Sequence, residues 1–210
     1  SECCRLWTES VRKRLALLAA VVLAWALAAP SAQPSRGLIV GIFDEQSSLG
    51  RPDWAFPQYN SLGVEALRVN LYWGGPSGVA KRKPANAVNP ADPAYDWSTY
   101  DTFVKRAAEN RKKVVFSILW TPTWAIAPRE KKKANRAPAR MKDLQNFAFA
   151  AAKRYSGSFR PDPDGPALPP VRFWLAWNEP NNPVFLFPQF RYIGGRHRPV
   201  SPAVYAKMCN

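Results

Sequence analysis

The sequence has few of the side chains from which metal sites and disulfide frameworks are built. Its single histidine is His197, and its three cysteines are Cys3, Cys4 and Cys209. Because Cys3 and Cys4 fall in an expected leader, only Cys209 remains for the mature chain. This excludes an internal disulfide framework and a cysteine zinc site, and one histidine excludes a histidine-rich metal centre. We therefore expect no metal and no cofactor.

The sequence also lacks an apolar run of the length that crosses a membrane. Its longest such run, residues 15–29, is shorter than the roughly 20 residues that a spanning helix needs. Basic residues 12–14 precede the run, and Ala26 and Ala28, on either side of Leu27, match the small-residue pattern read by signal peptidase. We expect residues 1–36 to be a leader with a secretory signal peptide and residues 37–210 to be secreted. An uncleaved signal is the one membrane anchor left open.

Acidic residues are scarce, with 15 Asp and Glu against 30 Lys and Arg, for a formal net charge of +15. Such a balance is typical of nucleic-acid binding, but a secretion signal argues against that partner. The densest basic cluster is residues 129–142. A solvated loop is the ordinary interpretation of such a cluster. The functional alternative is an acidic polysaccharide, because clustered cations raise the local concentration of anionic chains.

Hydrophobic residues are abundant, at 47% of the chain with nine tryptophans, so the chain can bury a core. Four short runs are apolar nearly throughout, as parallel strands covered on both faces should be. They are residues 38–43, 66–73, 114–120 and 171–178.

Helical patterns separate these runs. Residues 98–113 begin with a capping-box spacing that ends at Asp101 and continue with an apolar stripe. A second stripe covers residues 141–155, and weaker helices are expected after residue 56 and from residue 201. Strand and helix thus alternate about four times, which predicts an α/β fold with a parallel sheet.

Long loops follow the predicted strands at residues 74–97, 121–140 and 181–200. In α/β barrels the loops at the carboxyl ends of the strands build the active site. The fourth strand ends in Asn178 and Glu179, before a proline that cannot donate a backbone hydrogen bond. A strand-to-turn boundary with a solvated glutamate is one interpretation.

A catalytic carboxyl group is the other interpretation of Glu179. A carboxyl group beside Trp177, at the tip of an apolar strand, is expected to be partly desolvated. Partial burial favours the protonated form, which a general acid needs to protonate a leaving glycosidic oxygen.

The chain resembles the clan A glycoside hydrolases, (β/α)8 TIM-barrel enzymes that retain anomeric configuration, most closely families 39 and 5. The motifs that carry the resemblance are "LRVNLYW" at 67–73, "LWTPTWA" at 119–125 and "WNEPN" at 177–181. The resemblance implies that Glu179 is the acid/base and that Asn178 binds the sugar 2-hydroxyl. It also implies that Arg68 holds the carboxylate of the nucleophile; a turn cap and a structural ion pair are the alternatives for Asn178 and Arg68.

Tryptophans gather at or after the predicted strand ends and would stack on pyranose rings of a poly- or oligosaccharide substrate. Core packing is the alternative for each of them. They are Trp73, Trp120, Trp124 and Trp177.

One element of the family pattern is missing. A retaining mechanism needs a second carboxylate about 5 to 5.5 Å from the first, and the family places it after the seventh strand. The chain matches about four strand-helix units, so we expect the amino-terminal half of a barrel, inactive by itself. Asp44 and Glu45, after the first strand, are a less favoured substitute. Two further hypotheses are a non-catalytic secreted carbohydrate-binding protein and a basic module for acidic polysaccharides.

Overall fold

The computed structural model describes residues 37–130 and 133–209. The predicted leader, residues 1–36, lies outside the described residues. One compact unit begins at Ile39 and contains all the elements named below.

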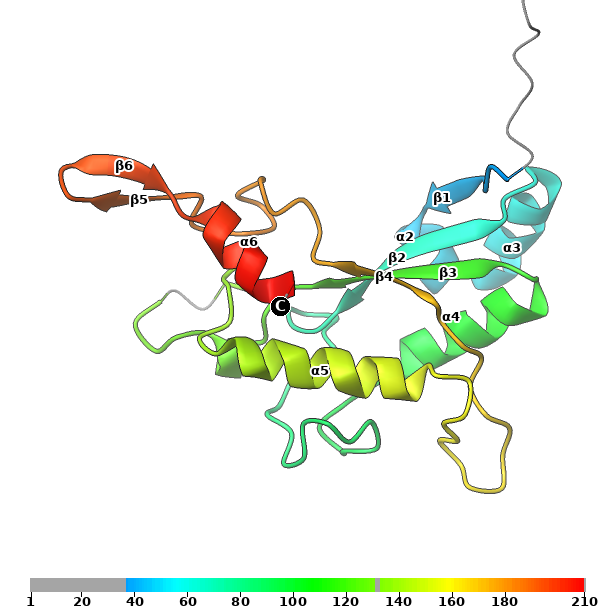
Figure 1. The fold of residues 1–210 in the computed structure, drawn as a ribbon. Helices are drawn as coiled ribbons and strands as arrows, with labels where there is room; N and C mark the ends of the chain where they lie inside the picture. Colours follow the sequence, from blue (N-terminus) through cyan, green and yellow to red (C-terminus); the bar gives the residue numbers. More distant parts are fainter. Residues whose placement is uncertain (1–36, 131–132, 210) are drawn as a thin grey trace, which may run out of the picture. The chain divides into compact units, whose positions relative to one another are not determined.

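The centre of this unit is a parallel four-stranded sheet with its strands in sequence order (Figure 1). It confirms the predicted α/β class and all four predicted strands. The closed barrel is not confirmed, because within the described residues the first and fourth strands each pair on one side only. The strands are β1 (Gly41–Phe43), β2 (Ala66–Tyr72), β3 (Lys113–Leu119) and β4 (Phe173–Ala176).

Helices connect consecutive strands, as predicted. One begins earlier than expected, at Pro52, and a short helix after β1 was not foreseen. The helices are α2 (Glu45–Gly50), α3 (Pro52–Ser61), α4 (Ser98–Glu109), α5 (Met141–Arg154) and α6 (Ser201–Cys209), with a 3-10 turn η1 (Thr123–Ala125).

Asp101 has a different role from the predicted capping box. The Ser98 hydroxyl at the start of α4 donates to the Asp96 carboxylate at 2.6 Å. The Asp101 carboxylate instead accepts from Arg154 Nε at 2.9 Å and from the Tyr155 hydroxyl at 3.0 Å. Arg154 is buried, so this contact is a buried ion pair that joins α4 to α5. The capping-box prediction was wrong because a buried arginine competes for the carboxylate.

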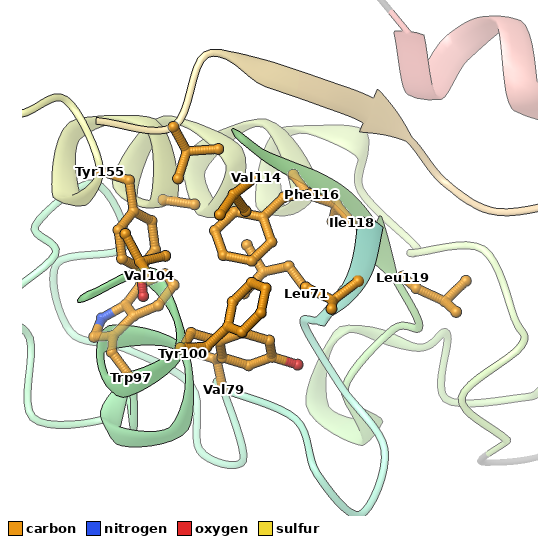
Figure 2. Packing of buried hydrophobic residues seen from close by; sticks show 14 of the residues in the cluster. Leu71, Val79, Trp97, Tyr100, Val104, Val114, Phe116, Ile118, Leu119 and Tyr155 are labelled. Carbon is orange, nitrogen blue, oxygen red and sulfur yellow. The ribbon is translucent and has the colours of Figure 1, made fainter. Parts of the chain in front are cut away.

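One face of the sheet, called here the helix-covered face, packs against α4 and α5 (Figure 1). Alternating side chains of β2 from Leu67 to Trp73 point into this layer and are fully buried. Phe116 of β3 contacts aromatic rings from both helix regions, with Tyr100 at 5.8 Å and Tyr155 at 5.4 Å between ring centroids. Figure 2 shows this aromatic cluster, which is the core of the unit.

The other face, called here the second face, carries the alternate residues of each strand. Its rows follow from the strand register: Phe43, Arg68, Val115 and Phe173 in one row, and Asn70, Ser117 and Leu175 in the next. Several of its large apolar side chains are about half exposed, Phe173 at 45% among them. The two faces therefore differ in burial although they share the same strands.

The loop predicted at 181–200 contains an antiparallel hairpin of β5 (Phe190–Ile193) and β6 (Arg196–Pro199). Its two turn residues, Gly194 and Gly195, have φ angles of 59° and 76°. Two successive positive φ angles are typical of the tight turn that matches strand twist, and glycine adopts them without strain. The Gly-Gly pair was the sequence signal for this hairpin.

Candidate functional site

The candidate site lies where β2, β3 and β4 end. Arg68 Nη2 on the second face donates a hydrogen bond to Asn178 Oδ1, just beyond β4. The Arg68 guanidinium also lies over the Phe43 ring, 5.0 Å from its centroid. Asn178 is buried, so this bond satisfies an amide oxygen that water does not reach. The structure thus brings together two of the residues that the sequence singled out.

The backbone after β4 turns sharply. Trp177 and Glu179 have φ angles of 69° and 38°, which few residues other than glycine adopt. Two contacts hold this turn: the buried Ser117 hydroxyl donates to the Trp177 carbonyl at 2.7 Å, and Trp177 Nε1 donates to the Phe185 carbonyl at 2.9 Å. Strained backbone of this kind persists only where its surroundings fix it, and it is common at functional sites.

Glu179 is exposed, which corrects the expectation that it is partly desolvated. Its Oε2 accepts one hydrogen bond, from Asn182 Nδ2 at 3.1 Å. Glu179 is exposed because it lies beyond the end of β4, which is an edge strand of the described sheet.

The four tryptophans divide into two pairs. Trp73 is in the core, stacked on Phe147 at 5.7 Å between ring centroids, and Trp177 is buried as well. Their ring faces are therefore not available to a sugar, and a stacking role does not fit either of them. Trp120 and Trp124 are partly buried, so a contact with saccharide stays a prediction for these two.

Tyr72 is a site residue that the sequence reasoning missed. Its ring lies 4.8 Å from that of Trp120 between centroids, tilted by 34°, at the carboxyl ends of β2 and β3. Its hydroxyl donates to Glu45 Oε2 at 2.8 Å. Burial, and then the hydrogen bond to Glu45, raise the pKa of Tyr72 to about 12, so it stays protonated at neutral pH. The sequence could have indicated Tyr72, because it lies four residues after Arg68 on the same strand and therefore on the same face of the sheet.

Asp44 and Glu45 are both engaged in contacts within the fold. Asp44 caps α2, accepting from Ser47 N and from the Tyr59 hydroxyl, each at 3.0 Å. Burial acts to raise the pKa of Asp44, but the hydrogen bonds together outweigh it and lower that pKa. Glu45 accepts from Asn70 N as well as from Tyr72. These contacts favour structural roles over the nucleophile for which the pair was considered.

A cavity of about 590 Å³ adjoins these residues at the carboxyl end of β2. Its lining includes Glu45, Tyr72, Lys81 and Asp96, and so combines an aromatic ring with hydrogen-bonding groups of both charges. Ligand pockets commonly measure about 300 to 1,000 Å³. The cavity is therefore large enough for a small saccharide.

Among residues 37–130 and 133–209, no group of three His, Cys, Asp or Glu side chains is placed to hold a metal ion. In the same part of the chain, no helix is both long enough and apolar enough to cross a membrane.

Comparison with known proteins finds little. No protein-family profile matches the chain, and no curated protein sequence is similar to it. Among solved structures, a glucosidase from Croceicoccus marinus is similar with a TM-score of 0.48 and 13% sequence identity. The similarity covers 73% of this chain and 28% of the glucosidase chain. A likeness of this size assigns neither a fold nor a reaction.

Proposed function

We propose that this chain contributes Glu179 as the general acid and base of a secreted retaining β-glycosidase of barrel architecture. The observation that carries the proposal is the hydrogen bond between Arg68 and Asn178. It fixes Asn178, the residue before Glu179, at the carboxyl edge of a parallel sheet, the edge at which α/β proteins bind their ligands.

The orientation of Asn178 supports a sugar-binding role. A guanidinium group only donates hydrogen bonds, so the oxygen of the amide must face Arg68. The amide nitrogen is then left as a donor, and a sugar hydroxyl can accept from it. Because the hydrogen bond from Arg68 fixes the amide of Asn178, a sugar hydroxyl bound to its nitrogen would be held next to Glu179.

Glu179 would act by proton transfer. Protonated, it would donate to the glycosidic oxygen as that oxygen leaves; ionised, it would later accept a proton from the attacking water. A saccharide lying against Glu179 would cover its carboxyl group and exclude water from it. The exposure in the free protein leaves room for that substrate.

The mechanism needs a second carboxylate about 5 to 5.5 Å from the first. Because Asp44 and Glu45 are already held by other groups, we propose a glutamate on a later strand of the complete protein, as the family resemblance implies. The proposal is therefore tested on the product of the complete gene.

The test is hydrolysis of aryl β-glycosides and β-glucans by the full-length protein and its Glu179→Gln variant. We expect kcat to fall by about 10² to 10⁴ in the variant, the usual contribution of a general acid or base. Glu65→Gln is the matched control, since Glu65 is exposed at the opposite end of β2, and it should keep full activity. Unchanged hydrolysis by Glu179→Gln would contradict the proposal.

The exposure of Glu179 favours a second candidate, a secreted carbohydrate-binding protein without catalysis. In that case the full-length protein would bind saccharides without hydrolysing them. Glu179→Gln would then leave binding unchanged, whereas Asn178→Ala would weaken it.

A further inference from the structure

The β5–β6 hairpin has two chemically different faces. Residues paired across an antiparallel ladder point to the same side, and successive pairs alternate. The register pairs Tyr192 with His197, and Phe190 with Pro199, on one side, which is the aromatic face. The opposite side, the cationic face, pairs Arg191 with Arg198 and Ile193 with Arg196.

The cationic face carries charge that the described residues neutralise only in part. Residues 184–200 contain no acidic side chain. Arg191 reaches out of the hairpin to Glu130 at 2.8 Å, but Arg196 and Arg198 have no ion-pair partner among the residues described. Like charges directly opposite each other destabilise a ladder; Glu130 offsets the charge of Arg191, so Arg196 and Arg198 are the groups that would favour binding of an anion.

The aromatic face is exposed although it is large. Phe190 is 60% and Tyr192 70% exposed, and the Tyr192 ring meets the His197 ring edge-on, at 5.3 Å between centroids. An isolated hairpin is only marginally stable in water, so burying these rings in the core would have been the more stable arrangement. The exposed rings of Phe190 and Tyr192 are instead available to stack on a ligand.

The base of the hairpin is joined to the loop that carries Glu179. Gln189 Nε2 donates to the Pro180 carbonyl at 3.0 Å, immediately after the candidate acid. Phe187 bridges to Arg136, whose guanidinium lies 4.2 Å from the centroid of the Phe187 ring. The base of the hairpin is thus anchored to the loop that carries Glu179.

We propose that the β5–β6 hairpin is a binding arm for an acidic polysaccharide. The aromatic face stacks on pyranose rings, and Arg196 and Arg198 pair with carboxylate or sulfate groups along the polymer. This inference rests on the proposed function for its substrate class, and it narrows that class to charged chains. It is tested by binding, so that its outcome does not depend on hydrolysis.

The experiment measures the affinity of the full-length protein for polygalacturonate, alginate and chondroitin sulfate by calorimetry. Fully methyl-esterified polygalacturonate, which keeps the backbone and loses the charge, is the matched ligand control. We expect binding of at least one acidic polymer, weaker binding of the ester, and affinity that falls as salt rises. The inference would be overturned if the protein bound none of the three polymers. It would also be overturned if DNA or anionic lipid vesicles bound more tightly than the acidic polymers.

Variants locate the binding. The Arg196→Glu/Arg198→Glu double variant should lose about tenfold or more in affinity, because it reverses two charges that face the polymer. Lys105→Glu/Arg172→Glu changes the net charge equally at exposed positions outside the hairpin and should lose much less. Equal losses of affinity in the two double variants would show a general effect of net charge and would contradict the binding role of the hairpin.

Tyr192→Ala tests the aromatic face and should weaken binding of acidic and esterified polymers alike. A melting temperature unchanged from the parent protein, measured for each variant, shows that the fold is intact. If the protein binds acidic polymer through the hairpin but hydrolyses no glycoside, the proposed function is contradicted and the binding role of the hairpin is supported.

Discussion

Tyr72 and Trp73 are neighbours in the sequence, yet they belong to the two different faces of the sheet. Trp73 is fully buried against Phe147 on the helix-covered face, whereas Tyr72 lies on the second face and contacts Glu45 and Trp120. Stability depends on the first face and the candidate chemistry on the second. A single strand therefore serves both, because its side chains alternate.

The two faces should differ most in the stability lost when a phenylalanine is replaced by alanine. Phe147→Ala removes a fully buried ring that stacks on Trp73 and Trp97, so it should lower the free energy of unfolding by about 3 to 5 kcal/mol. Phe173→Ala, on the second face, should cost about 1 kcal/mol or less because that ring is 45% exposed. Urea unfolding followed by circular dichroism measures both. Equal losses would mean that the second face is covered in solution.

A smaller effect is expected from the ion pair behind the helix-covered face. Asp101→Asn leaves the buried Arg154 charge unbalanced and should cost about 3 kcal/mol. The control is Asp53→Asn, which breaks a pair with Arg106 whose aspartate side chain is 84% exposed, and it should cost about 0 to 1 kcal/mol. The same unfolding experiment applies. A small loss at Asp101 would show that water reaches Arg154.

The smallest expected effect is on the pH dependence of stability at alkaline pH. Burial raises the pKa of Tyr72 to about 12 and raises that of Tyr100 as well, above the ordinary 10. Below pH 10 both are protonated in the folded and unfolded states, and their stabilisation is fully present. As pH rises above 10 the unfolded state loses protons first, so stability falls until the folded pKa is passed.

Single Tyr-to-Phe variants separate the two faces in that pH range. Tyr100→Phe should flatten the decline more than Tyr72→Phe, because Tyr100 is the more deeply buried of the two. Melting temperature measured from pH 9 to pH 12 is the readout. A steeper decline in either variant would contradict the assignment of raised pKa values.

Much of the fold follows from the sequence because apolar runs and apolar stripes report burial directly. All four strands and the helices at residues 98, 141 and 201 begin within a few residues of their predicted positions. The short helix after β1 has six residues, Glu45–Gly50, so it is too short to show an apolar stripe, and its local cap at Asp44 was overlooked. The β5–β6 hairpin was missed because its apolar residues are few and exposed, so its two short strands do not read as the buried apolar runs by which the other strands were identified.

The candidate site was predictable in part. Asn178 and Glu179 were identified from residue types at a strand end and Arg68 from the family resemblance, and the structure brings Arg68 to Asn178. The tryptophans were harder, since a one-residue shift along a strand decides whether a side chain lies in the core or in the site. Trp73 fell on the core side of that divide. The exposure of Glu179 depends on what surrounds β4, which no local pattern encodes.

A backbone hydrogen bond closes the base of the β5–β6 hairpin, and this affects which changes in sequence length the fold can accept. Val200 N donates to the Gln189 carbonyl at 2.9 Å, so the chain enters and leaves the hairpin at adjacent points. An insertion or deletion between them alters the length of the projection with little additional loop-closure entropy. Hairpins of other lengths could therefore replace the segment between Gln189 and Val200 without a change in the parallel sheet.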